Sequence, residues 1–530
     1  MTSPNRKQYF LPRPIKQTIA ETRASWALSK TITVPGRIEP RPAQPGKHRI
    51  AFLIYRGNPQ CGGQGVYTRH LTRELVRLGH SVEVFSGPPW PELDEGVGFT
   101  PVRGLDLYRN PDPFRIPAMS EFTSLADLAE FAVMCTGGFG EPLAYSLRIK
   151  KILKKRRADF DIIHDNQCIG TGIMSLHKAG WPLLETLHHP ITVDRSIALD
   201  HAEGMWKRYT TRRWFGFLRM QVRTVKRLPA VLTVSHNSKK DINAQMKVPL
   251  ERLTVVPVGV DHTVFKPYAD VVKKKGRLMV TTSSDVPMKG LVPLLEAVAK
   301  LRTERDIDLI VIGKPKAKGR VQETMDRLGL NDIVTTISGV TDEELARLYG
   351  EAEVAVVPSL YEGFSLPAIE AMSCAVPVIA TTGGALPEVV GISGETGILV
   401  EPNNPEALVT AIRDLLDDAP LRTKLGDAGR VRVMERFTWE VTARGTAACY
   451  DAILNNTPLP ASMDFDYCLL LITTFSDLRL ATRFLTSVAD SVVTPLKPLA
   501  EGPMLWLLMQ VATKLKVLLQ LLLPWLKQES

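Results

Sequence analysis

Short apolar runs alternate with helical patterns along most of this chain, and this alternation limits the folds it can adopt. The run Ile50–Tyr55 is followed by Val66–Leu78, which carries apolar residues at helical spacing. Strands that alternate with helices in this way are typical of a parallel sheet with helices on both faces. The strands expected in this first series are 50–55, 81–85, 161–164, 183–187, 230–234 and 253–256.

The same pattern begins again after a link at residues 262–275 that contains Pro and Lys. The strands expected in this second series are 278–281, 308–312, 334–337, 354–357 and 378–380. Because 530 residues are too many for one compact core, we expect two domains. The sequence therefore predicts an α/β protein with two facing, Rossmann-like, doubly wound domains. Ligands should bind in the central cleft, at the carboxyl ends of both sets of strands.

The two ends of the chain differ from its middle. Residues 1–48 are rich in Pro and are expected to be a flexible extension. Residues 1–50 hold ten Lys and Arg against two Glu, which accounts for most of the net charge of +10. A basic arm suits an anionic surface, either membrane or nucleic acid, and the alternative is a solvated tail. It has no apolar core with a cleavage site, so it is not expected to be a signal peptide.

Residues 457–530 form an extension of a different character. Its segment 504–527 is very apolar, with Lys514 and Lys516 near its middle. Those charges argue against a transmembrane span and favour an amphipathic helix lying in the plane of a membrane. The alternative is a helix packed on its own protein or on a partner.

The six cysteines lie far apart and form no Cys-x-x-Cys pair. This spacing suggests neither a zinc site nor a disulfide framework, and it fits reduced thiols in a cytosolic enzyme. We therefore expect a cytoplasmic protein with no metal site.

Two carboxylates, Glu362 and Glu370, stand eight positions apart around an expected turn and helix start. The preceding run 352–359 is typical of a buried parallel strand. Ser365 is expected to cap the helix and Pro367 to occupy its first turn. Free amides at such a helix start attract phosphate. Both carboxylates are therefore expected to face one crevice, although an ordinary strand-loop-helix unit is the alternative.

Three further candidates lie where expected strands end. Lys289 precedes the expected helix 291–301 and can neutralise a diphosphate without a metal. His188 follows a strand and can bond a sugar hydroxyl, and the alternative is a structural histidine. The glycine loop 62–65 lets a substrate approach the backbone, but Thr68 replaces the third glycine of a dinucleotide fingerprint.

A set of motifs in this order resembles the family 4 glycosyltransferases. The motifs are Gly62-Gly63, Val256-Pro-Val-Gly259-Val-Asp261, Lys289-Gly290, Ser338-Gly-Val-Thr-Asp-Glu343, Glu362-Gly-Phe-Ser-Leu-Pro-Ala-Ile-Glu370, Gly383-Gly384-x-x-Pro387-Glu388 and Arg436-Phe-Thr-Trp439. The resemblance covers about residues 49–455 and is most specific in the second half. It implies a retaining, nucleotide-sugar-dependent enzyme with the GT-B fold.

The resemblance also implies domain boundaries. The acceptor-binding domain would span residues 49–262, and the nucleotide-sugar-binding domain would span residues 263–438. A helix at 439–456 would cross back to the first domain.

The resemblance implies roles for single residues. Glu362, His188 and Lys289 would be catalytic, with Lys289 at the diphosphate, Glu362 beside the transferred sugar and His188 on the acceptor side. Glu370 would hold the ribose hydroxyls of the donor. The remaining implied donor-side residues are Ser284, Gly339, Val340, Gly363, Phe364, Ser365 and Leu366, and the implied acceptor-side glycines are Gly62 and Gly63.

One departure from the family pattern concerns the phosphate site. The family commonly carries Gly-Arg where this chain has Ser283 and Ser284. A hydrogen bond to a charged group contributes about 1.5–3 kcal/mol against ~1 kcal/mol for a neutral one. The donor site is thus expected to hold its diphosphate with one fewer positive charge. Asp159-Phe-Asp161 resembles a metal-binding motif, but it leads into a strand and is expected at the surface.

The segment 206–227 mixes aromatic residues with eight cations. It suits an anionic lipid surface or a phosphorylated acceptor, and the alternative is an ordinary basic helix. With both chain ends it suggests a lipid-linked or cell-envelope acceptor and peripheral contact with the inner face of a membrane.

The expected function is transfer of a hexose-type sugar from a UDP- or GDP-sugar, as co-substrate, to a hydroxyl acceptor. No cofactor and no nucleic-acid partner are expected. The alternatives are a non-catalytic scaffold, or a phosphorylase or disaccharide synthase on the same fold.

Overall fold

The computed structural model describes residues 34–58, 63–109, 112, 114–200, 202–282, 286–313, 319–460 and 462. Gly62, Ser283, Ser284 and the apolar segment 504–527 lie outside the described residues.

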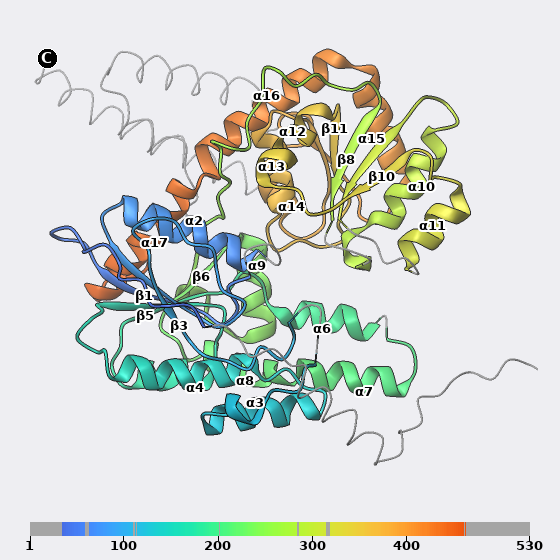
Figure 1. The fold of residues 1–530 in the computed structure, drawn as a ribbon. Coiled ribbons are helices and arrows are strands. Elements are labelled where there is room, and N and C mark those ends of the chain that lie inside the picture. The colour runs from blue at the N-terminus through green and yellow to red at the C-terminus, as the bar shows by residue number, and fades with distance from the viewer. Residues whose placement is uncertain are drawn as a thin grey trace, which may run out of the picture. The chain divides into compact units, whose positions relative to one another are not determined.

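The first half of the described chain forms a seven-stranded sheet with helices packed on both faces (Figure 1). Its strand order is β3-β2-β1-β4-β5-β6-β7, and every neighbouring pair is parallel. The strands are β1 Arg49–Ile54, β2 Ser81–Ser86, β3 Gly98–Pro101, β4 Ile162–Asn166, β5 Leu183–Thr186, β6 Val231–Thr233 and β7 Leu253–Val255. The helices are α2 Gln64–Arg77, α3 Leu125–Cys135, α4 Glu141–Lys154, α5 Thr171–Lys178, α6 Ile191–Asp200, α7 Met205–Trp214, α8 Leu218–Val225 and α9 His236–Asp241.

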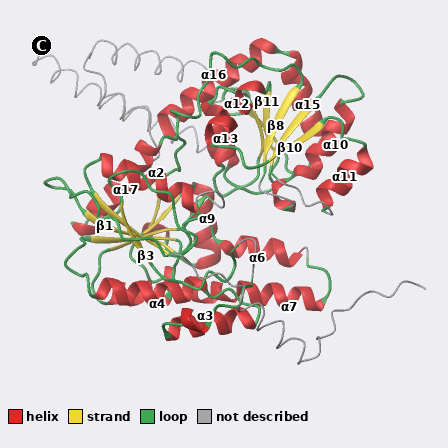
Figure 2. Cartoon of the chain, viewed as in Figure 1, coloured by secondary structure: helices red, strands yellow, loops and turns green. Residues whose placement is uncertain are grey.

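The second half repeats this architecture with a six-stranded parallel sheet of order β10-β9-β8-β11-β12-β13. The strands are β8 Arg277–Thr281, β9 Asp308–Ile312, β10 Val334–Ile337, β11 Val354–Val357, β12 Val378–Thr381 and β13 Ile398–Val400. The helices are α10 Leu291–Leu301, α11 Arg320–Leu328, α12 Asp342–Glu351, α13 Leu366–Ser373, α14 Leu386–Val390, α15 Pro405–Asp417 and α16 Ala419–Arg436. Figure 2 shows both sheets among their helices. The predicted fold class, two α/β domains with parallel sheets, is therefore confirmed.

The two faces of the first sheet bury different residues because successive side chains of a strand point to opposite sides. Ile50, Phe52 and Ile54 of β1 belong to a core that includes Leu71 of α2. Ala51 and Leu53 belong to a second core, which contains side chains of α4 and α5. A strand buried on both faces needs a continuous apolar run, which is what the sequence provides.

The last described helix, α17 (Trp439–Leu454), packs against α2 and β5 of the first domain. Its start is held by a parallel bridge between Val260 and Thr438. A Cβ on Gly259 would lie only 2.3 Å from the backbone nitrogen of Trp439, so a glycine is needed there. The Trp439 ring stacks on His70 of α2, with centroids 5.2 Å apart.

The prediction that residues 1–48 form a flexible extension was wrong for residues 34–48, because this segment is attached to the first domain. Ile38 and Phe99 exchange two backbone hydrogen bonds of 2.8 Å, which attach this segment to β3. Arg37 bonds the buried Glu83 of β2 at 3.2 Å. A buried carboxylate needs cationic partners, so this arginine ties the segment to the domain.

In the described ranges, none of the helices is both long and apolar enough to span a membrane.

Candidate functional site

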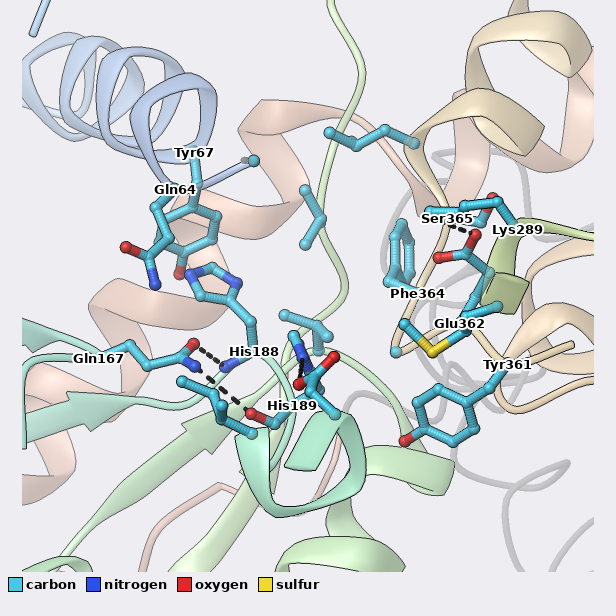
Figure 3. Close-up of a pocket in the computed structure, with 18 of the residues that line it drawn as sticks. Gln64, Tyr67, Gln167, His188, His189, Lys289, Tyr361, Glu362, Phe364 and Ser365 are labelled. Atoms are coloured by element: carbon cyan, nitrogen blue, oxygen red, sulfur yellow. Dashed lines mark hydrogen bonds and ion pairs between the residues drawn. The ribbon is translucent and has the colours of Figure 1, made fainter. Parts of the chain in front are cut away.

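A cavity of about 470 Å³, called here the interdomain cavity, lies between side chains of both domains (Figure 3). Its lining residues are Gly63, Gln64, Tyr67, Gln167, His188, His189, Ile191, Asp194, Phe215, Val234, Val258, Met288, Lys289, Tyr361, Glu362, Gly363, Phe364, Ser365 and Leu366. The polar groups from the first domain are mainly amides and imidazoles, whereas the second domain contributes a cation and a carboxylate.

Lys289 reaches the cavity from a tight turn between β8 and α10. Gly290, the next residue, has a φ of 64°, and a Cβ there would lie 1.8 Å from the carbonyl oxygen of Pro358. A side chain at position 290 would therefore push the turn away from the end of β11. The turn is also fixed by a 2.7 Å bond from the Leu360 N–H to the Met288 carbonyl.

Lys289 forms an ion pair with the first of the two expected carboxylates. Its Nζ lies 2.8 Å from Glu362 Oε1, and both side chains are largely buried, with 24% and 13% exposed. The Ser359 hydroxyl donates to the same oxygen at 2.7 Å. An anionic ligand that approaches Lys289 would therefore compete with Glu362 for this cation.

Ser365 occupies the N-cap position of α13, but the prediction that it caps this helix was wrong. Its backbone has a φ of 123° and a ψ of 91°, unlike the extended conformation usual at an N-cap, and its side chain makes no capping bond. Ser365 Oγ is buried without a partner among the described residues. Pro367 lies in the first turn, as predicted. The first-turn amides of α13 thus receive no cap from Ser365.

Glu370 lies one turn into α13 but is not among the residues that line the interdomain cavity. Its carboxylate accepts a 3.3 Å bond from the Tyr349 hydroxyl. Burial raises the pKa of Glu370 to about 7, and the charge of Asp342 contributes to this increase. The hydrogen bond from Tyr349 lowers the pKa and offsets part of it. Gly339 and Val340 likewise do not line this cavity. Of the donor-side predictions in the described chain, Lys289 and residues 362–366 are brought together here.

His188 lies on the other side of the cavity, just beyond β5. Its ring packs edge-on to the Tyr67 ring of α2, with centroids 4.7 Å apart. Burial, and next the neighbouring His189, lower the pKa of His188 to about 3, so the ring is neutral near pH 7. His188 Nε2 lies 2.8 Å from Asn166 Oδ1. Gly63, the described member of the predicted glycine pair, also lines the cavity.

Gln167 holds the backbone around His188. Its Oε1 accepts the His188 N–H at 3.0 Å, and its Nε2 donates to the His189 carbonyl at 3.4 Å (Figure 3). The imidazole of His189 lies 2.8 Å from Asp194 at the start of α6.

Sequence reasoning missed Asn166, Gln167 and Tyr67. The signal for the first two was present, because polar residues directly follow the apolar run of β4, at the edge where ligands bind. No sequence signal pointed to Tyr67, because an aromatic residue in a helical pattern is usually a core residue.

Helix α9 of the first domain contacts the loop that carries Glu362. The hydroxyls of Ser235 and Ser238 donate to the Gly363 carbonyl at 2.7 and 3.1 Å. The Tyr361 hydroxyl donates to Asp241 Oδ2 at 2.6 Å.

A second contact reaches α9 from the second domain. Both oxygens of Glu388, at the start of α14, accept backbone N–H groups of α9: that of His236 at 2.7 Å and that of Asn237 at 2.6 Å. Glu388 thus satisfies amides that the α9 helix itself cannot pair.

The part of the chain that the structure describes holds no group of three or more His, Cys, Asp or Glu side chains able to bind a metal. Asp159 and Asp161, which resemble a metal-binding motif, instead pair with Arg156 and Arg49, both at 2.6 Å.

Comparison with known proteins agrees with this arrangement. The family model described as Glycosyl transferases group 1 matches residues 268–432, and the model described as Glycosyltransferase Family 4 matches residues 61–264. The chain is 50% identical over 404 residues to MMP alpha-(1->4)-mannosyltransferase of Mycolicibacterium hassiacum, covering 76% of this chain and 98% of that protein. It is 28% identical to D-inositol 3-phosphate glycosyltransferase of Segniliparus rotundus, covering 80% of this chain and 94% of that protein.

Solved structures show the same fold. Sucrose-phosphate synthase from Thermosynechococcus elongatus is 25% identical with a TM-score of 0.61, covering 78% of this chain and all of that chain (100%). WaaG, a glycosyltransferase involved in lipopolysaccharide biosynthesis, is 17% identical with a TM-score of 0.56, covering 75% of this chain and 98% of that one. With the two parallel-sheet domains and the cavity between them, these matches show that the chain belongs to the family 4 glycosyltransferases and has the GT-B fold.

Proposed function

We propose that this glycosyltransferase moves a mannosyl group from a nucleoside diphosphate mannose to a hydroxyl of a carbohydrate acceptor. The observation that carries this proposal is the 50% identity to a mannosyltransferase, which spans nearly all of that protein. The identity to the inositol-phosphate enzyme is much lower, at 28%. A sugar hydroxyl is therefore favoured as the acceptor over inositol phosphate.

The donor side offers positive charge where a diphosphate would need it. Lys289 is a compact cation at the cavity wall, and the uncapped amides at the start of α13 lie on the same side. In this proposal the diphosphate takes Lys289 from Glu362, which frees the Glu362 carboxylate to accept a hydroxyl of the transferred sugar. Glu370 accepts the ribose hydroxyls.

The same groups account for the chemical step. Negative charge develops on the leaving diphosphate, and Lys289 and the amides stabilise it there. The freed Glu362 carboxylate is assigned to a hydroxyl of the transferred sugar and stays bonded to the Ser359 hydroxyl, so we do not assign it as a covalent nucleophile. We therefore propose that the acceptor oxygen bonds to the anomeric carbon on the face that the diphosphate leaves, as the bond from that carbon to the diphosphate oxygen breaks. The hydroxyl proton passes to the leaving phosphate oxygen, and the configuration is retained. His188 lies on the acceptor side.

The experiment is an activity panel with the purified full-length protein. GDP-mannose, UDP-mannose, GDP-glucose and UDP-glucose are each incubated with an α-mannoside oligosaccharide or with inositol 3-phosphate. The proposal expects nucleoside diphosphate release that depends on mannose donor and mannoside acceptor, with an α-linked product by NMR. Glu362→Gln should abolish it, whereas Glu395→Gln, on an exposed loop, should not.

Other outcomes of the panel would contradict the proposal. Release of sugar phosphate from glycoside and phosphate would indicate a phosphorylase. Failure of every donor to bind or turn over would indicate a scaffold. A product with the opposite anomeric configuration to the donor would contradict the retaining mechanism.

We also propose that the protein makes peripheral contact with an anionic membrane through α7. Met205, Trp206 and Tyr209 are 90%, 76% and 58% exposed. Lys207 and Arg208 lie between them in the sequence. Aromatic side chains beside cations suit the interface of an anionic bilayer.

Vesicle flotation tests this contact. The protein should float with vesicles that contain phosphatidylglycerol and not with phosphatidylcholine alone. The double variant W206A/Y209A should float several-fold less than the matched surface variant L125A, which changes another exposed apolar residue of the same domain. Equal flotation of both variants, or none of the wild type, would contradict the proposal.

A further inference from the structure

Asn166 connects the acceptor-side histidine to helix α2. This residue ends β4 and is fully buried. Its Oδ1 lies 2.8 Å from His188 Nε2, and its Nδ2 lies 3.1 Å from the Thr68 hydroxyl. The two ends of one amide therefore contact groups from two different elements.

The orientation of this amide follows from its surroundings. The Thr68 hydroxyl donates to the Gln64 carbonyl at 2.8 Å, so it presents a lone pair to Asn166. Asn166 Nδ2 also lies 3.5 Å from the Gln64 carbonyl oxygen. The flipped amide would place two acceptor oxygens against each other, so Oδ1 must face His188. An oxygen acceptor requires a proton on His188 Nε2.

The other ring nitrogen of His188 is then an acceptor. Nδ1 has no hydrogen-bond partner in the described ranges, and His188 lines the interdomain cavity, from which a ligand would approach its ring. The titratable groups packed near the ring are His164, His189 and Tyr67. Those that line the cavity with it are Asp194, Lys289 and Glu362. None of these forms a bond with His188 that would force a proton onto Nδ1.

We propose that Asn166 is a positioning residue that holds His188 as the neutral Nε2–H tautomer, so that Nδ1 accepts a hydrogen bond from a sugar hydroxyl. The sugar in this inference rests on the proposed function. His188 then orients a substrate hydroxyl and does not donate a proton to it. In this assignment, His188 can accept the hydrogen bond from the sugar hydroxyl only while its ring is uncharged.

The first test reads the tautomer without any substrate. The full-length protein is labelled with ¹⁵N-histidine, and long-range ¹H–¹⁵N spectra are compared with those of His188→Gln to identify the His188 signals. We expect the neutral Nε2–H pattern throughout pH 5–8. A Nδ1–H pattern, or an imidazolium pattern near pH 7, would overturn the proposal.

Two substitutions test the role of Asn166 in the same spectra. Asn166→Asp places a carboxylate against Nε2, which favours the imidazolium, so His188 should become protonated at or above pH 6. Thr68→Val removes the nearer of the two acceptors that orient the amide and leaves only the Gln64 carbonyl oxygen at 3.5 Å, so a second tautomer should appear. If both variants keep the wild-type His188 pattern, Asn166 does not set it.

A pH profile separates this role from a purely structural one. The transfer rate of Asn166→Asp should fall about tenfold per pH unit below the raised His188 pKa, whereas the wild type has no such step. Asn404→Asp, which keeps its cap on α15, makes the same charge change and should follow the wild type. A rate lowered by one constant factor at every pH would overturn the proposal. If the wild type transfers no sugar, the proposed function fails while the spectra still decide the tautomer.

Discussion

At the scale of single residues, the donor side of the interdomain cavity is electrically balanced before a ligand arrives. Lys289 and Glu362 are largely buried and paired, and Ser359 supports the carboxylate. Removing one member of a buried pair costs more than removing both, because it leaves a charge without a partner.

This balance predicts an asymmetry between two substitutions. Lys289→Met should lower the free energy of unfolding by about 1–3 kcal/mol, since Glu362 keeps only a hydroxyl donor. It should also raise the donor KM or abolish turnover. Glu362→Gln should cost less stability, because an amide oxygen still accepts from Lys289. Urea unfolding of both variants and of the double variant K289M/E362Q measures the coupling. Additive losses would show that the pair does not act as a unit.

Glu370 gives a prediction about pH. Burial raises its pKa from 4.5 to about 7, so folding favours the neutral carboxyl. Stability from this group is fully present below pH 4.5 and is lost as pH rises through 7. Relative to Glu370→Gln, the wild type should lose up to about 3 kcal/mol between pH 4.5 and 8.

Urea unfolding of the wild type and Glu370→Gln at several pH values measures this difference. Because an ionised carboxylate is the better acceptor for ribose hydroxyls, donor affinity of the wild type should rise over the same range. A stability difference that is constant with pH would contradict the assigned pKa.

At the scale of elements, the start of α13 carries backbone strain. Ser365 has a φ of 123°, a region that favours glycine, and its buried hydroxyl has no partner among the described residues. Ser365→Gly should therefore raise the free energy of unfolding by about 1 kcal/mol. Ser365→Ala removes the hydroxyl but keeps the strain, so thermal unfolding of the two variants isolates the backbone effect. A glycine variant no more stable than the alanine variant would show that strain is not the cause.

Sequence patterns predicted the strands with continuous apolar runs and missed two edge strands, β3 and β13. β1 and β11 were expected because they are buried on both faces. β3 and β13 lie at sheet edges, and the first, Gly98–Pro101, begins and ends with residues that disfavour strands.

The candidate site divides in a similar way. Lys289, Glu362 and His188 could be placed because each follows a strand, and strand ends meet at one edge of a sheet. The prediction that Ser365 caps α13 was wrong because no sequence pattern indicates a positive φ at a serine. The Asn166–His188 bond could not be predicted because it depends on the neighbouring register of β4 and β5.

At the scale of the whole described molecule, the two domains touch through the loop that carries the donor-side residues. A Cβ on Gly363 would lie 2.9 Å from the Cβ of His189, so only glycine permits this approach of the loop to the first domain. Ser235 and Ser238 hold the Gly363 carbonyl, and Glu388 accepts two N–H groups of α9. The contact therefore links the position of the first domain to the geometry of the Glu362 loop.

This link predicts that Glu388 supports donor binding although it does not line the cavity. Glu388→Gln keeps the size of the side chain but replaces one acceptor oxygen by an NH₂ group, which leaves one α9 amide unpaired at a cost of about 1–3 kcal/mol. The donor KM should rise, and the amides of His236 and Asn237 should exchange hydrogen faster. Glu395→Gln removes the same charge from an exposed loop nearby and should change neither measurement. Faster exchange with an unchanged donor KM would contradict this prediction. It would show that the contact between α9 and Glu388 is separate from the donor site and that domain closure does not depend on this contact.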